Sequence, residues 1–233
     1  VPSSRFTELV AERAAALARV TDRPKVAEGV ELTELDRSIK TDRIDYPNLT
    51  SEIDRDTGVA IITLQGPSRA APSDLSDAHA EGAAFWPLAL ARELDDLILH
   101  LRANESEIGS LAFRTDGDVT SALAYDSFLY GNRDNWFIRE VLLLWKRLLK
   151  RVDVTARSLI TLIEPGSCFV GPLLELALAA DRSFMLDDRF EGDNLPPTVI
   201  CLTELNFGSL PMGNGLTRLE SRFLGDPDAV SRA

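Results

Sequence analysis

The strongest constraint on the fold is an alternation of apolar strand-like runs with helical runs between residues 59 and 186. Four runs are predicted as strands, residues 59–64, 108–115, 158–163 and 182–186, and the second and third of them as buried strands. Three stretches between them carry apolar residues at helical spacing: residues 86–104, 135–152 and 171–181. This order predicts an α/β protein with a mainly parallel sheet flanked by helices.

The segments before and between these runs are predicted with less regular structure. Residues 6–19 have the apolar spacing of an amphipathic helix, and residues 21–48 are charged and interrupted by prolines, which is typical of a linker or an extended wrap. A hairpin is predicted with its turn at 56–58. The stretches 68–78 and 115–126 are predicted as loops, the second at the carboxyl end of a strand, where ligands collect in such sheets.

Charge and composition exclude several classes of function. The formal net charge is -12, which argues against a protein that tracks nucleic-acid phosphates. The cysteines, Cys168 and Cys201, and the histidines, His79 and His100, lack metal-ligand spacing, so no metal site is predicted. No apolar run approaches the roughly 20 residues of a membrane span. We therefore expect no nucleic-acid or membrane partner, and a cytoplasmic location.

One acid interrupts an otherwise apolar helix in the stretch GSCFVGPLLELALAADRS, residues 166–183. Glu175 has no polar stripe beside it, so the helix is predicted to be buried. A buried carboxylate is costly unless a specific donor satisfies it. Two interpretations follow: Glu175 is held by an arginine such as Arg157 or Arg182, or it is retained for catalysis.

Two motifs resemble those of the crotonase (enoyl-CoA hydratase/isomerase) family. In LITLIEPGSCFVGPLLELALAADRSFML, a buried strand, a glycine turn and a helix lead to Asp181, six residues after Glu175. In TELNFGSLPMGNGLTRL, Glu204 lies seven residues before Pro211, as in the family. The resemblance covers about residues 50–225 and implies the layered crotonase-like α/β fold.

The resemblance also implies a chemistry. The family binds CoA thioesters, holds the thioester oxygen with two backbone N–H groups, and uses two glutamates for proton transfer. By motif, the catalytic acids here are Glu175 and Glu204, and the oxyanion donors fall near Leu123 and Gly171. No cofactor is implied, because CoA is part of the substrate, and a homo-oligomer is implied.

The chain departs from the family at the oxyanion turn. Pro172 stands where the family places glycine, and proline has no N–H to donate. Tyr125 adds bulk where the family has a small residue. We therefore predict that residues 49–233 form a non-catalytic crotonase-like domain with a truncated C-terminal end, and that residues 1–48 are the tail of a preceding crotonase-like half.

A non-catalytic domain is not the only function that these motifs allow. The alternative is a catalytically competent, acyl-CoA-binding domain that uses Glu175 and Glu204. A serine hydrolase of the same fold is excluded, because both histidines precede every candidate serine turn.

Overall fold

The computed structural model describes residues 2–21, 29–186 and 197–232. The chain divides into two compact units, Val1–Val30 and Glu31–Ala233, which are described separately. In the first unit, helix α1 spans Ser3–Arg19 and none of its residues is buried. The predicted amphipathic helix is therefore confirmed, and within its own unit its apolar stripe faces no packed neighbour.

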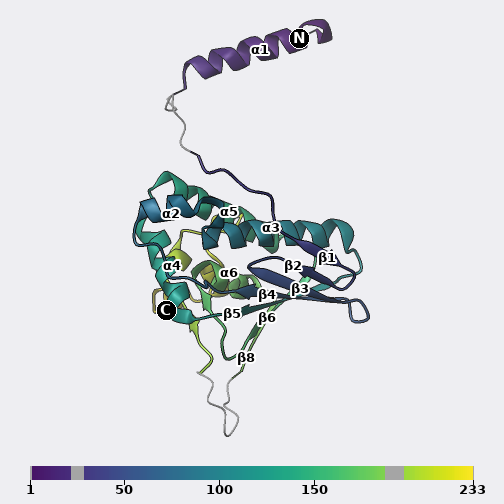
Figure 1. The fold of residues 1–233 in the computed structure, drawn as a ribbon, viewed down its shortest axis with the longest axis vertical. Coiled ribbons are helices and arrows are strands. Elements are labelled where there is room, and N and C mark those ends of the chain that lie inside the picture. The colour runs from purple at the N-terminus through teal and green to yellow at the C-terminus, as the bar shows by residue number, and fades with distance from the viewer. Residues whose placement is uncertain (1, 22–28, 187–196, 233) are drawn as a thin grey trace. The chain divides into compact units, whose positions relative to one another are not determined.

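The second unit is built on a seven-stranded sheet with the order β1-β2-β3-β4-β5-β6-β8 (Figure 1). Its strands are β1 Ser38–Lys40, β2 Arg43–Asp45, β3 Leu49–Asp54, β4 Val59–Gln65, β5 Ser110–Asp116, β6 Ser158–Ile163 and β8 Arg182–Met185. Strands β1 to β4 pair antiparallel, whereas β4, β5, β6 and β8 run parallel. The predicted hairpin and the parallel arrangement of the four predicted strands are confirmed.

Helices cover one face of this sheet. The helices of this unit are α2 Leu75–Glu81, α3 Trp86–Asn104, α4 Val119–Gly131, α5 Trp136–Asp153, α6 Gly171–Ala179, α7 Arg218–Arg222 and α8 Pro227–Arg232, with short 3₁₀ turns η1 Gly82–Ala84 and η2 Glu204–Phe207. Figure 1 shows α3, α5 and α6 on the same side of the sheet. Alternate residues of β4, namely Ala60, Ile62 and Leu64, are buried, as the two-residue period of a strand requires.

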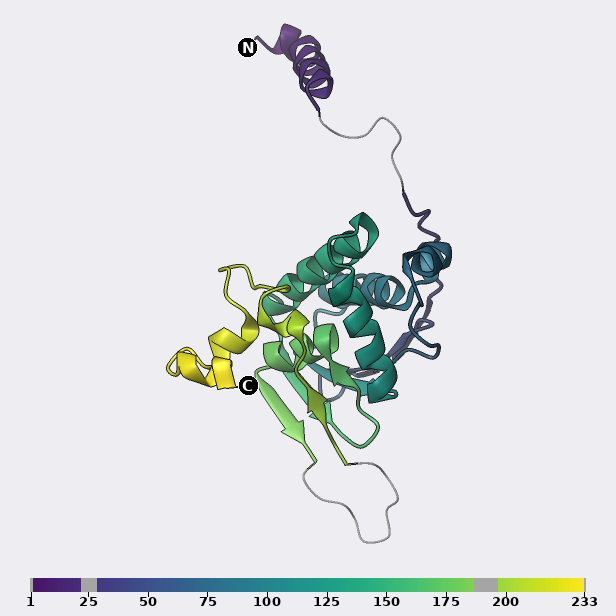
Figure 2. The ribbon, with the colours of Figure 1, turned by 90° about the vertical axis from the view of Figure 1, so that its left-hand side faces the viewer.

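Helix α6 forms the centre of the second unit. It packs against β5 and β6, against α5, and against η2 and α7 (Figure 2). Its first seven residues, Gly171–Ala177, are all buried. The prediction of a buried helix around Glu175 is confirmed.

Two predicted loops contain helices, and in both a local cap explains the difference. Helix α4 begins inside the predicted loop 115–126, where the Asp118 side chain accepts a hydrogen bond from the Ser121 N–H at 2.7 Å. Helix α2 begins inside the predicted loop 68–78, where Asp74 caps it in the same way. Such caps satisfy N–H groups that lack intrahelical partners.

The predicted linker 21–48 is wrong for its second half. Strands β1 and β2 lie there, and Ile44 and Tyr46 are 1% and 6% exposed. Burial of these two side chains explains why a charged segment adds to the sheet. Strand β9 Ile200–Cys201 pairs with β7 Phe169–Val170 in a separate two-stranded sheet.

The carboxyl ends of β4, β5 and β6 converge at three glycines. The Gly66 N–H donates to the Asp116 carbonyl at 2.8 Å, and the Gly117 N–H donates to the Gly166 carbonyl at 2.9 Å. A Cβ on Gly117 would lie 2.7 Å from the Gly66 Cα, so the close approach requires glycine. This edge of the sheet leads directly into α4 and α6.

Candidate functional site

Glu175 is buried and bonded at both carboxylate oxygens. Its Oε1 accepts from Asn206 Nδ2 at 2.7 Å, and its Oε2 pairs with Arg218 Nη1 at 2.8 Å. The side chains of Glu175 and Arg218 are each 1% exposed. An arginine partner was predicted, but the two named candidates are wrong. Arg157 donates instead to backbone carbonyls, and Arg182 is exposed.

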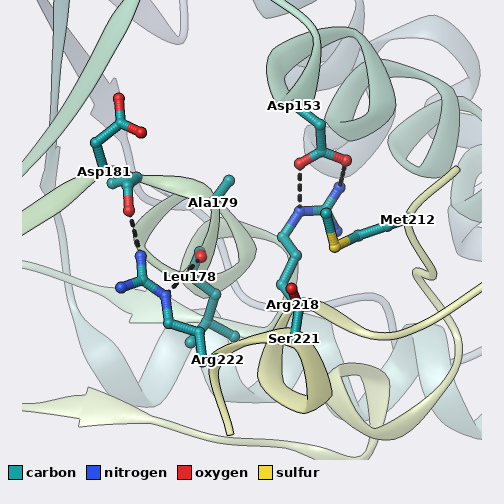
Figure 3. Close-up of a pocket in the computed structure, with 9 residues that line it drawn as sticks. Asp153, Leu178, Ala179, Asp181, Met212, Arg218, Ser221 and Arg222 are labelled. Carbon is teal, nitrogen blue, oxygen red and sulfur yellow. Dashed lines mark hydrogen bonds and ion pairs between the residues drawn. The ribbon is translucent and has the colours of Figure 1, made fainter. Parts of the chain in front are cut away.

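Arg218 joins three parts of the second unit through its guanidinium. Besides Glu175 on α6, it binds Asp153 at the end of α5 in a bidentate pair, with Nε–Oδ1 at 2.9 Å and Nη2–Oδ2 at 2.7 Å. It also donates to the Leu210 carbonyl at 3.0 Å. Figure 3 shows the Arg218–Asp153 pair. One buried cation therefore serves two carboxylates.

The surroundings of Glu175 act on its acidity in opposite directions. Burial raises the pKa of Glu175, while the hydrogen bonds from Asn206 and Arg218 oppose that rise. Both oxygens already accept from buried donors, and solvent reaches almost none of the side chain. Among the described residues, both oxygens of this carboxylate are therefore occupied within a buried ion pair.

Glu204 does not join Glu175. It is exposed and begins η2, whereas Asn206, two residues later, makes the contact with Glu175. Asn206 is held by Thr203, whose N–H donates to Asn206 Oδ1 at 3.0 Å in a capping box. The sequence analysis missed Asn206 and Arg218. A signal for Asn206 was its three-residue spacing from Thr203, and Arg218 lies within the TRL segment of the second motif.

The two predicted oxyanion donors differ in their surroundings. Leu123 is the fifth residue of α4, beyond the first turn, where an N–H bonds within the helix, and this weighs against it as a donor. Gly171 is the first residue of α6, so its N–H is not used by the helix. Pro172 follows as the second residue and brings no N–H. Pro172 thus removes one of the N–H donors in the first turn of α6, while Leu173 and Leu174 keep theirs.

Asp126 occupies the space beside Gly171. The Asp126 side chain is 5% exposed, its Oδ1 has no hydrogen-bond partner, and an added Cβ on Gly171 would lie 1.8 Å from that oxygen. Next to them lies a cavity of about 10 Å³, room for about one water. Its lining includes Trp86, Trp145 and Pro172. This cavity is too small for a thioester.

A larger opening lies at the opposite end of α6 (Figure 3). It has a volume of about 350 Å³ and is lined in part by Asp153, Asp181 and Ser221. Arg222 donates there to the carbonyls of Leu178 at 3.0 Å and of Ala180. Arg222 thereby caps the C-terminus of α6, and Asp153 at the same opening is paired with Arg218.

Other chemistry at this edge is limited by burial. The Cys168 side chain is fully buried, and burial raises the pKa of its thiol to about 11, so it is a core residue and not a nucleophile.

Across residues 2–21, 29–186 and 197–232, no cluster of three or more histidines, cysteines or acids could hold a metal ion. In the same residues no helix is long and apolar enough to cross a membrane.

The architecture places the chain in the crotonase class. It matches the crystal structure of a protein assigned as an enoyl-CoA hydratase/isomerase from Bordetella parapertussis with a TM-score of 0.50 and 16% identity, covering 79% of this chain and 63% of that one. No family model matches the sequence. The fold is therefore the crotonase-like α/β fold.

Within that class, the sequence points to one enzyme. The chain is 45% identical over 231 residues to benzoyl-CoA-dihydrodiol lyase from Aromatoleum evansii. The aligned region covers 99% of this chain and 41% of the lyase. It is a crotonase-type relative of that lyase. The chain spans less than half the length of this relative.

Proposed function

We propose that this chain is a crotonase-type domain of a cytoplasmic lyase that opens the ring of an epoxidised, dihydrodiol-type benzoyl-CoA. Ring opening would be hydrolytic, with release of formate and without a metal or redox cofactor. The identity to a benzoyl-CoA-dihydrodiol lyase supports the substrate class. Residues 1–48 would be the tail of a preceding crotonase-like half, although the second compact unit already begins at Glu31.

We further propose that this domain is a scaffold that packs on the catalytic half and contributes to a homo-oligomer. The observation that carries this proposal is the burial of Glu175 between Asn206 and Arg218. Pro172, which has no N–H, adds a second argument, because an oxyanion hole with one donor loses about 3–4 kcal/mol of transition-state stabilisation. A domain that catalysed the main reaction would instead need an accessible glutamate and a full set of N–H donors at this turn.

The alternative is a catalytically competent domain that uses Glu175 and Glu204. The raised pKa of Glu175 favours it, because a proton-transferring acid works best with a pKa near the working pH. It also requires the Glu175–Arg218 pair to open and exposed Glu204 to turn inward. The scaffold function needs neither change.

The two functions differ in thioester binding, which isothermal titration calorimetry with benzoyl-CoA measures. The scaffold domain should give no saturable heat up to about 1 mM, the upper end of usual KM values. Free CoA is the matched ligand control. The Pro172→Gly variant, which restores an N–H, should behave in the same way, because the cavity beside it stays too small. Saturable micromolar binding of benzoyl-CoA, but not of CoA, would overturn the scaffold proposal.

A further inference from the structure

Asp126 on α4 is a buried acid that neither the ion-pair network nor the proposed function uses. It is 5% exposed, and its Oδ1 has no hydrogen-bond partner among the described residues. Other buried acids are paired: Glu93 binds Asn48 at 2.7 Å and 2.9 Å, and Glu175 binds Arg218. An unpaired buried carboxylate is costly, so the site favours the neutral acid.

The neighbours of Asp126 contribute little charge to offset burial. Helix α4 packs against β7, α6 and η2. Strand β7 carries no titratable residue. Glu175 on α6 is engaged with Arg218, and Glu204 on η2 is exposed. Across the adjoining cavity, α3 and α5 present Trp86, Pro87 and Trp145, which are neutral.

Thr203 connects this acid to the network that holds Glu175. The Thr203 hydroxyl donates to Asn206 Oδ1 at 3.2 Å, and Thr203 also lowers the pKa of Asp126 against the effect of burial. A hydroxyl has one proton to donate, and an ionised carboxylate can only accept. Ionised Asp126 therefore competes with Asn206 for the Thr203 proton. Asn206 in turn donates to Glu175 at 2.7 Å. A change in the hydrogen bonding of Asn206 therefore also affects the Glu175–Arg218 ion pair.

We propose that the Asp126 carboxyl binds and releases a proton in the folded protein and is the pH-sensing group at the start of α6. Protonated Asp126 leaves the Thr203 hydroxyl to Asn206 and presents an uncharged group to Gly171. Ionised Asp126 draws that hydroxyl away and places an unpaired charge in an apolar pocket. The hydrogen bonding around Glu175 then differs between acidic and neutral solution.

The direction of the pH effect follows from the pKa of Asp126. Burial raises it to about 6, and the hydrogen bond from Thr203 opposes the rise. An unfolded aspartate has a pKa of about 3.9. Between about pH 4 and pH 6 the unfolded chain releases the proton while the folded chain keeps it, so stability falls as pH rises. Above about pH 6 both states are ionised and the penalty from Asp126 is constant.

The test compares the chain with its Asp126→Asn variant from pH 4 to pH 8. Asparagine cannot ionise, so the folding equilibrium constant of the variant should exceed that of the parent by about a hundredfold at pH 7, and the two should converge near pH 4. Urea unfolding at each pH measures the difference. Asp134→Asn, a change at an exposed acid after α4, should follow the parent throughout.

Two further readouts follow Asp126 in the unaltered chain. The carboxyl ¹³C resonance of Asp126 in the unaltered chain should titrate near pH 6. Tryptophan fluorescence should change with the same midpoint, because Trp86 and Trp145 line the cavity beside Asp126, and this change should vanish in Asp126→Asn. An Asp126 resonance that titrates below pH 4, or stability curves that stay parallel from pH 4 to pH 8, would overturn the proposal.

Discussion

Replacing Arg218 with methionine should lower the free energy of unfolding by about 3–5 kcal/mol. The change leaves Asp153 and Glu175 buried without their shared cation, and the lone Leu210 carbonyl loses its donor. Removing one member of a buried ion pair is far costlier than removing a surface pair, because the remaining charge stays out of water. Urea unfolding followed by circular dichroism measures the loss.

A matched control is Arg232→Met, which removes an exposed pair with Asp226. Exposed pairs contribute about 0–1 kcal/mol, so this variant should unfold almost as the parent does. Adding Asp153→Asn and Glu175→Gln to Arg218→Met removes the stranded charges and should recover part of the loss. A loss under about 1 kcal/mol for Arg218→Met would show that the ion-pair network is not as the structure describes it.

Replacing Gly171 with alanine should lower the free energy of unfolding by about 2–5 kcal/mol, the second large effect. Gly171 has a φ of +49°, a left-handed conformation that costs other residues about 1–2 kcal/mol. The new Cβ would also lie 1.8 Å from Asp126 Oδ1, so α4 and α6 must move apart, and such overpacking costs about 1–3 kcal/mol. The measurement is the same urea unfolding.

Two variants separate these causes. Gly131→Ala, in α4, places its Cβ where no atom lies within 4 Å, and should leave stability unchanged or slightly higher. Adding Asp126→Ala to Gly171→Ala relieves the steric conflict. The remaining loss of unfolding free energy should then equal only the cost of the left-handed backbone conformation at residue 171. If Gly171→Ala alone is neutral, the close approach of Asp126 to Gly171 is wrong.

The strands could be predicted because continuous apolar runs in the sequence indicate buried elements. Residues 59–64 and 158–163 are apolar enough that no exposed element suits them, and both became strands of the parallel sheet. The helix α4 could not be predicted in the same way. Its start depends on one cap, Asp118, and its apolar residues do not form a single stripe, because β7, α6 and η2 all pack on it.

The candidate site was predictable only in part. The burial of Glu175 follows from its apolar neighbours, but the choice of Arg218 over Arg157 depends on a contact across 43 residues of chain. The motif predicted Glu204 as the second acid, but in the 3₁₀ turn η2 Glu204 is exposed and Asn206 contacts Glu175. A shift of two residues in a short turn decides which side chain reaches Glu175, and spacing alone does not determine it.

The structural role of Glu175 is tested most directly by turnover of the Glu175→Gln variant in a full-length benzoyl-CoA-dihydrodiol lyase that contains this domain. Arg218 keeps Asp153 as a counter-ion, so the change should lower the free energy of unfolding by about 1–3 kcal/mol, the cost of an imperfectly satisfied buried group. Turnover, measured per folded enzyme, should stay within a few-fold of the parent. A fall in turnover of about a hundredfold or more with unchanged stability, the loss typical of a removed acid–base group, would contradict the structural role and make this domain catalytic.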